Sequence, residues 1–289
     1  MTRTFAHFCA IDWSGAVGER QRGIAVAMCD AGRDAPVLVR PDHVWSRGEI
    51  LAWLRDELPD DTLVGLDIGS SLPFADVGAF FPGWDDTPSD ARALWALVDA
   101  ICADDPHLSA TSFVDHAHAA RHFRRHGGRT GDLYPPGRGR LRTSERGQGE
   151  QGLNPYSNLN LVGAAQVGKS SLTGMRVLHQ LSSALPVWPY DPVPTSGSLV
   201  VEIYTSIAAR DAGLPKGRSK VRDAATLDAA LIALGSAPPA SLARYDDHAT
   251  DAMMGAAWLR IAASDPGLWE PIGLTPDLAR TEGWTFGVR

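Results

Sequence analysis

The chain has 289 residues, of which 44% are hydrophobic and 21% charged, as is usual for a globular protein. A formal net charge of -7 argues against a general polyanion binder. The sequence contains no apolar run long enough for a membrane span, and its polar start does not resemble a secretory signal. We therefore expect a cytoplasmic protein with no membrane partner, and the sequence indicates no particular protein partner.

Three apolar segments separated by short turns open the chain and predict an antiparallel meander of strands. They cover residues 5–15, 22–30 and 35–45. A helix is predicted over 46–58, where apolar residues recur at helical spacing behind a serine that can cap the first turn. Residues 61–71 then return to an apolar strand.

A long insertion interrupts this pattern over about residues 72–195. It contains a helix predicted over 88–102 and a basic segment rich in Gly, Pro and Arg at about 121–152. Eight arginines lie between His116 and Arg146 against only two acids, a concentration that could hold a phosphate backbone. The same composition fits a solvated loop, and the sequence leaves both interpretations open.

The remainder of the chain alternates again between helices and strands. The predicted helices cover 173–185, 223–234 and 245–260, and the predicted strands cover 197–206 and 282–288. Helices that follow apolar strands in this way are typical of a mixed sheet covered on both faces. We therefore predict that residues 1–289 form a single α/β domain with an insertion.

Carboxylates interrupt apolar runs in four places, and each would be costly to bury without compensation. They are Asp12, Asp67, Glu202, and the pair Asp247 and Asp251. The capping of a turn or of a helix explains any one of them taken alone. Strand ends that converge at one edge of a sheet would instead gather the acids into a site for a divalent metal ion.

The helix predicted over 245–260 places two of these acids on one face. Four residues advance a helix by about 400°, so Asp247 and Asp251 lie together, and His248 stays within reach of them. Asp246 points away and is expected to favour the positive end of the helix dipole. Next to the acidic face lie small residues that would let the helix approach a sheet: Ala249, Ala252, Ala256 and Ala257.

Asp12 on a first strand, Asp67 on the strand after the first helix, and the late motif DDHATDA resemble the RNase H-like superfamily. The late motif also looks like the Asp/His-x-x-Asp-Ala segment of Holliday-junction resolvases. More closely, the chain resembles the bacterial family called domain of unknown function 429, usually described as predicted nucleases of RNase H-like fold. The resemblance spans nearly all of the chain through AIDWSGA, GLDIGSSLPF, LNLVGAAQVGKSSLTGM, PVWPYD, VVEIYTS, SKVRDA, DDHATDA and EGWTFGV.

This resemblance implies hydrolysis of phosphodiester bonds in DNA or RNA by two Mg²⁺ or Mn²⁺ ions held by carboxylates. Asp12 would bridge the two ions. Asp67 would supply the second acid by strand order, whereas Glu202 is a rival because VVEIY looks like the acid-bearing strand of the resolvases. The late helix would complete the ligand set with Asp251 and either Asp247 or His248.

Three cations are candidates for contacts with phosphate. Lys220 and Arg222 in SKVRDA could each neutralise a phosphate, although a solvated cation at a helix start explains either one alone. Lys169 lies in GAAQVGKS, residues 163–170, which satisfies the G-x-x-x-x-G-K-[ST] pattern of a phosphate-binding loop after the possible strand LNLV. A nucleotide-binding ATPase is therefore one alternative function, and a catalytically inactive nucleic-acid-binding module is another. No organic cofactor is predicted.

Overall fold

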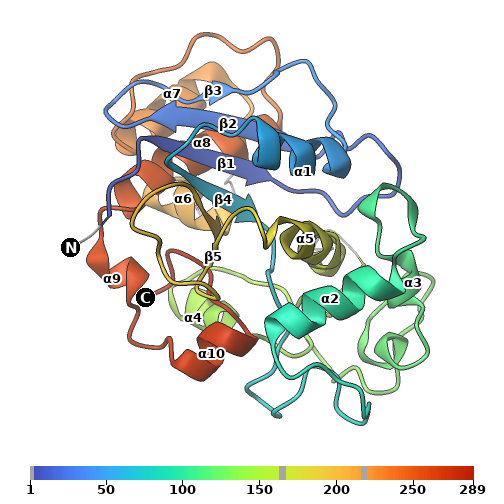
Figure 1. The fold of residues 1–289 in the computed structure, drawn as a ribbon. Coiled ribbons are helices and arrows are strands. Elements are labelled where there is room, and N and C mark those ends of the chain that lie inside the picture. Colours follow the sequence, from blue (N-terminus) through green and yellow to red (C-terminus); the bar gives the residue numbers. More distant parts are fainter. Residues whose placement is uncertain (1–2, 163–166, 216–219) are drawn as a thin grey trace.

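The computed structural model describes residues 3–162, 167–215 and 220–289, and a six-stranded mixed sheet lies at its centre (Figure 1). The strand order is β3-β2-β1-β4-β6-β5. The first three strands pair antiparallel, and β4, β6 and β5 continue the sheet in parallel. The strands are β1 (His7–Asp12), β2 (Ala25–Asp30), β3 (Val37–Leu38), β4 (Thr62–Asp67), β5 (Val187–Trp188) and β6 (Leu199–Glu202). The predicted meander and the α/β class are thus confirmed.

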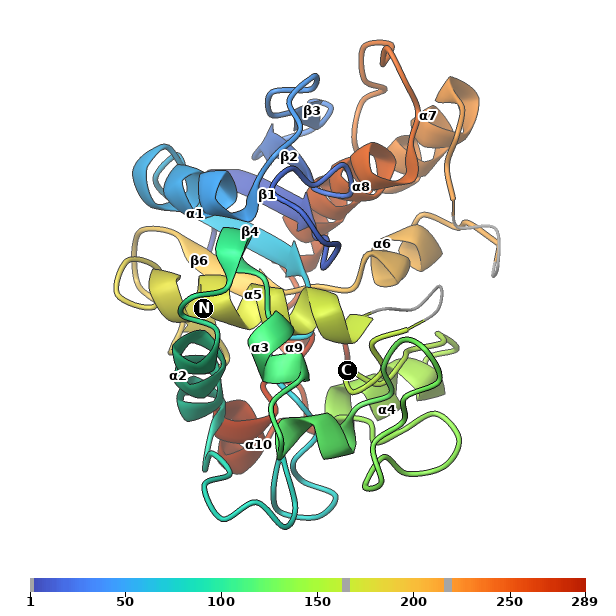
Figure 2. The same cartoon turned by 90° about the vertical axis from the view of Figure 1, so that its right-hand side faces the viewer.

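Helices cover both faces of the sheet, as Figure 2 shows from the side. On one face lie α1 (Arg47–Asp56) and α5 (Val167–Leu181), with α2 (Ala91–Ile101) against α5. On the other face lies α8 (Asp247–Ala262), with α6 (Thr205–Asp211) and α7 (Ala224–Ala233) against it. The shorter helices are α3 (Thr111–Val114), α4 (Thr143–Glu150), α9 (Pro266–Trp269), α10 (Pro276–Thr281) and the 3-10 turns Pro106–Leu108 and Ala119–His122.

Alternation of side chains along β1 divides the core into two halves. Cys9 and Ile11 belong to the half covered by α1 and α5, whereas Phe8 and Ala10 belong to the half covered by α8. By the same alternation, Asp12 leaves the end of β1 on the α8 face.

The neighbouring strand β4 repeats this pattern in register with β1. Val64 and Leu66 contribute to the half under α5, so Gly65 and Asp67 lie on the α8 face. The first strand and β4 therefore each end in an aspartate on the same side of the sheet.

α8 lies close to the sheet because the residues between them are small. A Cβ added at Gly255 would come within 2.9 Å of the Ala10 Cβ. One added at Gly65 would come within 2.8 Å of side-chain atoms of Ile203 and Leu259. Real Cβ atoms do not approach this closely, so the small residues set the height of α8 above the sheet.

The predicted insertion, residues 72–195, is continuous with the core. It supplies α5 to one face of the sheet and β5 to one edge. The basic segment within it, 121–152, is not a loop throughout, because α4 forms there. At the start of this helix the buried Arg142 Nε donates to Glu145 Oε1 at 2.9 Å, and the Arg142 backbone N–H donates to Glu145 Oε2.

Other segments also differ from prediction. Residues 159–162, expected as a strand before a phosphate-binding loop, lie outside the six-stranded sheet and form only an isolated bridge between Asn160 and Arg124. The predicted edge strand at 282–288 is reduced to one bridge between Glu202 and Thr285. In the described part of the chain, no helix has the length and apolar character needed to cross a membrane.

Candidate active site

Asp12 and Asp67 stand side by side at the carboxyl ends of two neighbouring parallel strands. They are register partners across β1 and β4 and lie on the same face of the sheet. Neighbouring strands are about 4.8 Å apart, so this register places the two carboxylates next to each other. Burial and then the charge of Asp12 raise the pKa of Asp67 well above its usual range. The predicted convergence of these two strand ends is therefore found in the structure.

Asp251 approaches the same pair from α8. Burial, followed by the charge of Asp12, raises the pKa of Asp251 to about 7. The charge of Asp251 in turn contributes to the raised pKa of Asp67. Within the described ranges, no hydrogen bond reaches the Asp251 carboxylate. Three carboxylates thus share a poorly solvated space in which ionisation of one opposes ionisation of the next.

His248, one turn earlier on α8, contacts this group directly. Its Nδ1 lies 2.5 Å from Oδ2 of Asp12, and this hydrogen bond raises the pKa of His248. Burial raises the pKa of Asp12, while the hydrogen bond and charge of His248 oppose that rise. A Cβ at Gly23 would lie 3.3 Å from His248 Cε1, so a glycine just before β2 leaves room for the ring.

Asp247 brings the two predicted phosphate-binding cations to the same end of α8. Its Oδ2 accepts hydrogen bonds from Lys220 Nζ and, at 3.1 Å, from Arg222 Nη2. Its Oδ1 is buried and has no hydrogen-bond partner among the described residues. The charge of Lys220 also opposes the rise in the pKa of Asp12 and of Asp251 that burial causes. The side chains of Lys220 and Arg222 are 61% and 66% exposed, so both remain accessible to a ligand.

Glu202 does not join this group. It is the register partner of Leu66, and it therefore lies on the face opposite to Asp12 and Asp67. Its Oε2 accepts from Arg142 Nη1 at 2.8 Å and from Ser70 Oγ at 2.6 Å. Burial alone would raise the pKa of Glu202, but the charge of Arg142 and the hydrogen bonds to the carboxylate together outweigh this effect, and the pKa is lowered. Of the two rivals for the second acid, the structure places Asp67 beside Asp12, whereas Glu202 is engaged by Arg142, Ser70 and Thr285.

Lys169 has no interaction with Asp12, Asp67 or Asp251 among the described residues. It is half-buried near the start of α5, where burial lowers its pKa, and it lines a cavity of about 190 Å³ with Val17 and Leu172. Residues 163–166 of the GAAQVGKS motif lie outside the described residues. Because the preceding 159–162 are not part of the sheet, the strand-loop-helix context predicted for a phosphate-binding loop does not form.

The arginines of the basic segment are largely occupied within the protein. Five of the eight form ion pairs with carboxylates: Arg121, Arg125, Arg129, Arg140 and Arg142. An arginine that is already paired gives up one partner when it binds a phosphate, so this segment offers less free positive charge than its composition indicates.

The site fits a hard divalent cation such as Mg²⁺ or Mn²⁺ in the kind of donors that it offers. Mutually repelling carboxylates and the orphaned Asp247 Oδ1 are oxygen ligands of the type these ions prefer. With the side chains as they stand, the described residues contain no group of three His, Cys, Asp or Glu side chains placed to hold an ion. Ion binding would therefore require the carboxylates of Asp12, Asp67 and Asp251 to turn toward one another.

Two supporting residues were not predicted from the sequence. Thr205 Oγ1 donates to Asp67 Oδ2 at 2.8 Å and orients the second acid. Its only sequence signal is its place just after the apolar strand, in VVEIYTS. Arg142, which neutralises Glu202, belongs to a segment whose composition gave no sign of a buried cation.

In comparisons with known proteins, no family model, curated protein or solved structure matches this chain.

Proposed function

We propose that the protein is a metal-dependent nuclease of RNase H-like fold, related to the domain of unknown function 429 family. The observation that carries this proposal is the meeting of Asp12 and Asp67, at matched ends of neighbouring strands, with Asp251 of α8. Divalent cations would relieve the repulsion among these carboxylates. The antiparallel meander continued by parallel strands also supports the fold that the resemblance implies.

In this proposal Asp12, Asp67 and Asp251 hold Mg²⁺ or Mn²⁺, with Asp247 or His248 as a further ligand. The bound ions would activate water and stabilise the leaving oxygen of a phosphodiester. Thr205 holds Oδ2 of the Asp67 carboxylate through its hydrogen bond.

Two cationic side chains of the protein would neutralise the phosphate charge of the nucleic acid. Lys220 and Arg222 lie at the exposed rim and share one carboxylate oxygen of Asp247. A phosphate oxygen at the site would offer both side chains a stronger, charge-assisted acceptor. They would therefore bind and orient the phosphate, while His248 holds or releases a proton beside Asp12.

Cleavage and ion binding test the proposal together. Pure protein is incubated with labelled single- and double-stranded DNA and RNA in Mg²⁺, Mn²⁺ or EDTA, and its melting temperature is measured with and without Mn²⁺. We expect metal-dependent cleavage and stabilisation by Mn²⁺, both lost in Asp12→Asn and Asp67→Asn. Asp277→Asn, which changes a carboxylate that is 92% exposed on α10, is the matched control. No cleavage of any substrate and no response to Mn²⁺ would refute the proposal.

A further inference from the structure

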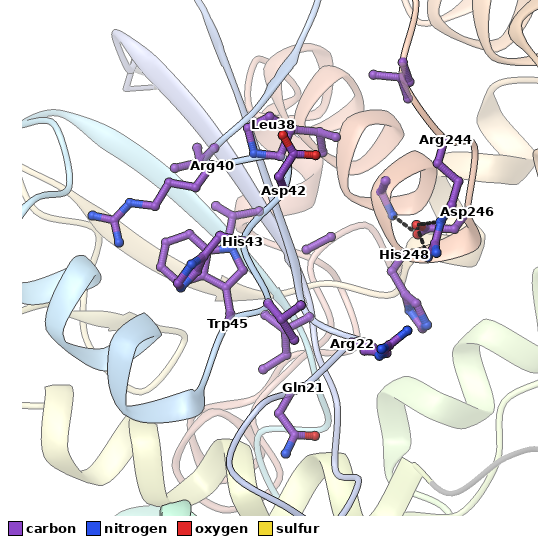
Figure 3. Close-up of a pocket in the computed structure, with 18 of the residues that line it drawn as sticks. Gln21, Arg22, Leu38, Arg40, Asp42, His43, Trp45, Arg244, Asp246 and His248 are labelled. Atoms are coloured by element: carbon purple, nitrogen blue, oxygen red, sulfur yellow. Dashed lines mark hydrogen bonds and ion pairs between the residues drawn. The ribbon is translucent and has the colours of Figure 1, made fainter.

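A cavity of about 300 Å³ opens beside the candidate active site, between the β2 and β3 edge of the sheet and the start of α8 (Figure 3). It exists because β3 ends after two residues, which leaves part of β2 without a neighbouring strand. The chain from 39 to 45 then forms one wall of the cavity, and 242–249 contributes the other.

The floor of the cavity is apolar and adjoins Asp12. It is formed by Ile24, Ala25 and Val26 at the start of β2, with Leu38 from β3. Ala25 is the register partner of Asp12, so the floor begins one strand away from the first carboxylate. His248 lines the cavity and also contacts Asp12, and it therefore connects the two sites.

Arginine side chains surround this apolar floor, and they differ in whether they already bind a carboxylate. Arg244 binds Asp246, the residue that caps α8, and Arg40 binds Glu57. Arg22 has no hydrogen bond or ion pair with another residue in the described part of the chain. Figure 3 draws Arg22 beside His248, with the guanidinium on the same side of the cavity as the imidazole. A guanidinium without a partner among the described residues thus lines the cavity on the same side as His248.

We propose that this cavity binds the nucleotide next to the scissile bond, with its base on the apolar floor and its phosphate held by Arg22. This inference rests on the proposed nuclease function and names the substrate class. A planar fork of N–H donors beside an apolar surface suits a nucleotide, because the guanidinium can bind the phosphate while the surface contacts the base. The cavity is at the lower limit of size for small-ligand sites, which suits one nucleotide rather than a base pair.

A base can enter such a cavity only after it leaves its stack. Single-stranded or locally unpaired nucleic acid takes this step at little cost, whereas a regular duplex must lose base pairing and stacking for each base that is extruded. The geometry therefore points to single-stranded or unpaired segments as the substrate of this protein.

Binding in EDTA tests the cavity independently of catalysis. The probes are a fluorescein-labelled 12-nucleotide single strand and the matching duplex, titrated with full-length protein at several salt concentrations. We expect the single strand to bind at least tenfold more tightly than the duplex. Arg22→Ala should weaken single-strand binding about fivefold and reduce the salt slope by roughly 0.7, as loss of one phosphate contact requires. Arg55→Ala, an exposed arginine on α1, should change neither.

A second pair of variants tests the cavity by charge. Val44 is exposed at the wall of the cavity, and Val37 is exposed on β3 but does not line it. Val44→Glu should weaken single-strand binding, and Val37→Glu should leave it unchanged. Equal affinity for single strand and duplex, no measurable binding, or wild-type binding by Arg22→Ala and Val44→Glu would each overturn the inference. Selective binding without metal-dependent cleavage would support the cavity and refute the nuclease, and cleavage without these binding effects would do the reverse.

Discussion

Nδ1 of His248 lies 2.5 Å from Oδ2 of Asp12, so a side chain from the late helix contacts the last residue of the first strand, 236 positions earlier in the chain. Asp67 stands beside Asp12 as its register partner. This contact holds the first turn of α8 over the ends of β1 and β4. The carboxylates are consequently brought together by tertiary packing and kept there at a cost in electrostatic repulsion.

That repulsion predicts a pH-dependent gain in stability for Asp251→Asn. Burial and the charge of Asp12 raise the pKa of Asp251 from its ordinary value of 3.8 to about 7 in the folded protein. A raised carboxylate pKa stabilises the fold at low pH, and this contribution is lost as the pH rises through 7. In EDTA at pH 8 the variant should therefore unfold with a free energy about 2–4 kcal/mol above wild type, and near pH 4 the two should be equal.

Urea denaturation at both pH values measures this difference. Asp277→Asn on the exposed surface of α10 is the control, and its effect should not depend on pH. If the free-energy difference between Asp251→Asn and wild type stays constant from pH 4 to pH 8, ionisation of Asp251 does not destabilise the fold.

Arg142 is predicted to be essential for stability because it neutralises a buried carboxylate. Arg142→Met would leave Glu202 and Glu145 buried without their cation and should lower the free energy of unfolding by about 3–5 kcal/mol. Arg146→Met, at an exposed position of the same helix, should change it by less than about 0.5 kcal/mol. Thermal and urea denaturation compare the two variants.

Glu202→Gln separates a structural role from metal binding. Since Glu202 lies on the opposite face of the sheet from Asp12, the variant should lose stability and still respond to Mn²⁺ as wild type does. The measurement is the rise in melting temperature on addition of Mn²⁺. If that rise disappears in Glu202→Gln but persists in Asp67→Asn, the second metal acid is Glu202.

The close approach of α8 to the sheet predicts that Gly255→Ala is destabilising. The new methyl group would lie 2.9 Å from the Ala10 Cβ, so the helix must move outward, at a cost of about 1–3 kcal/mol. Gly149→Ala on α4 meets nothing within 4 Å and should instead stabilise the protein by about 0.5–1 kcal/mol. Opposite signs in urea denaturation are the expected result, and equal effects would contradict this packing argument.

Lys169→Ala tests the alternative of an ATPase. Because residues 159–162 are not a strand of the sheet, we expect ATP with Mg²⁺ to leave the melting temperature of wild type and variant unchanged. A rise of several degrees in wild type that Lys169→Ala abolishes would instead establish nucleotide binding through this lysine.

The sequence predicted the parts of the fold that depend on local periodicity. The meander, α1, β4 and α8 all follow from the spacing of apolar residues, and the convergence of Asp12 and Asp67 follows from the expectation that strand ends meet. Glu202 could not be separated from Asp67 in this way. The face on which it lies depends on its pairing with Leu66, and a shift of one residue would reverse that face.

Longer-range features were beyond prediction for a similar reason. α4 lies in a segment with loop composition, and it is tied to the core by Arg142, which reaches Glu202 across 60 residues. The cavity beside His248 depends on where β3 ends, and the apolar residues from 35 to 45 predicted a longer strand there. In both places the decisive contacts are tertiary and leave no periodic signal.

The separation along the chain between β1 and α8 also determines when the candidate site can form. During translation, β1 and β4 leave the ribosome long before α8, which begins at Asp247 and covers both strands. Until that helix emerges, it cannot cover Ala10 and Gly65, and neither Asp251 nor His248 is present beside Asp12. The carboxylates of the candidate site therefore cannot assemble on the ribosome before α8 has emerged.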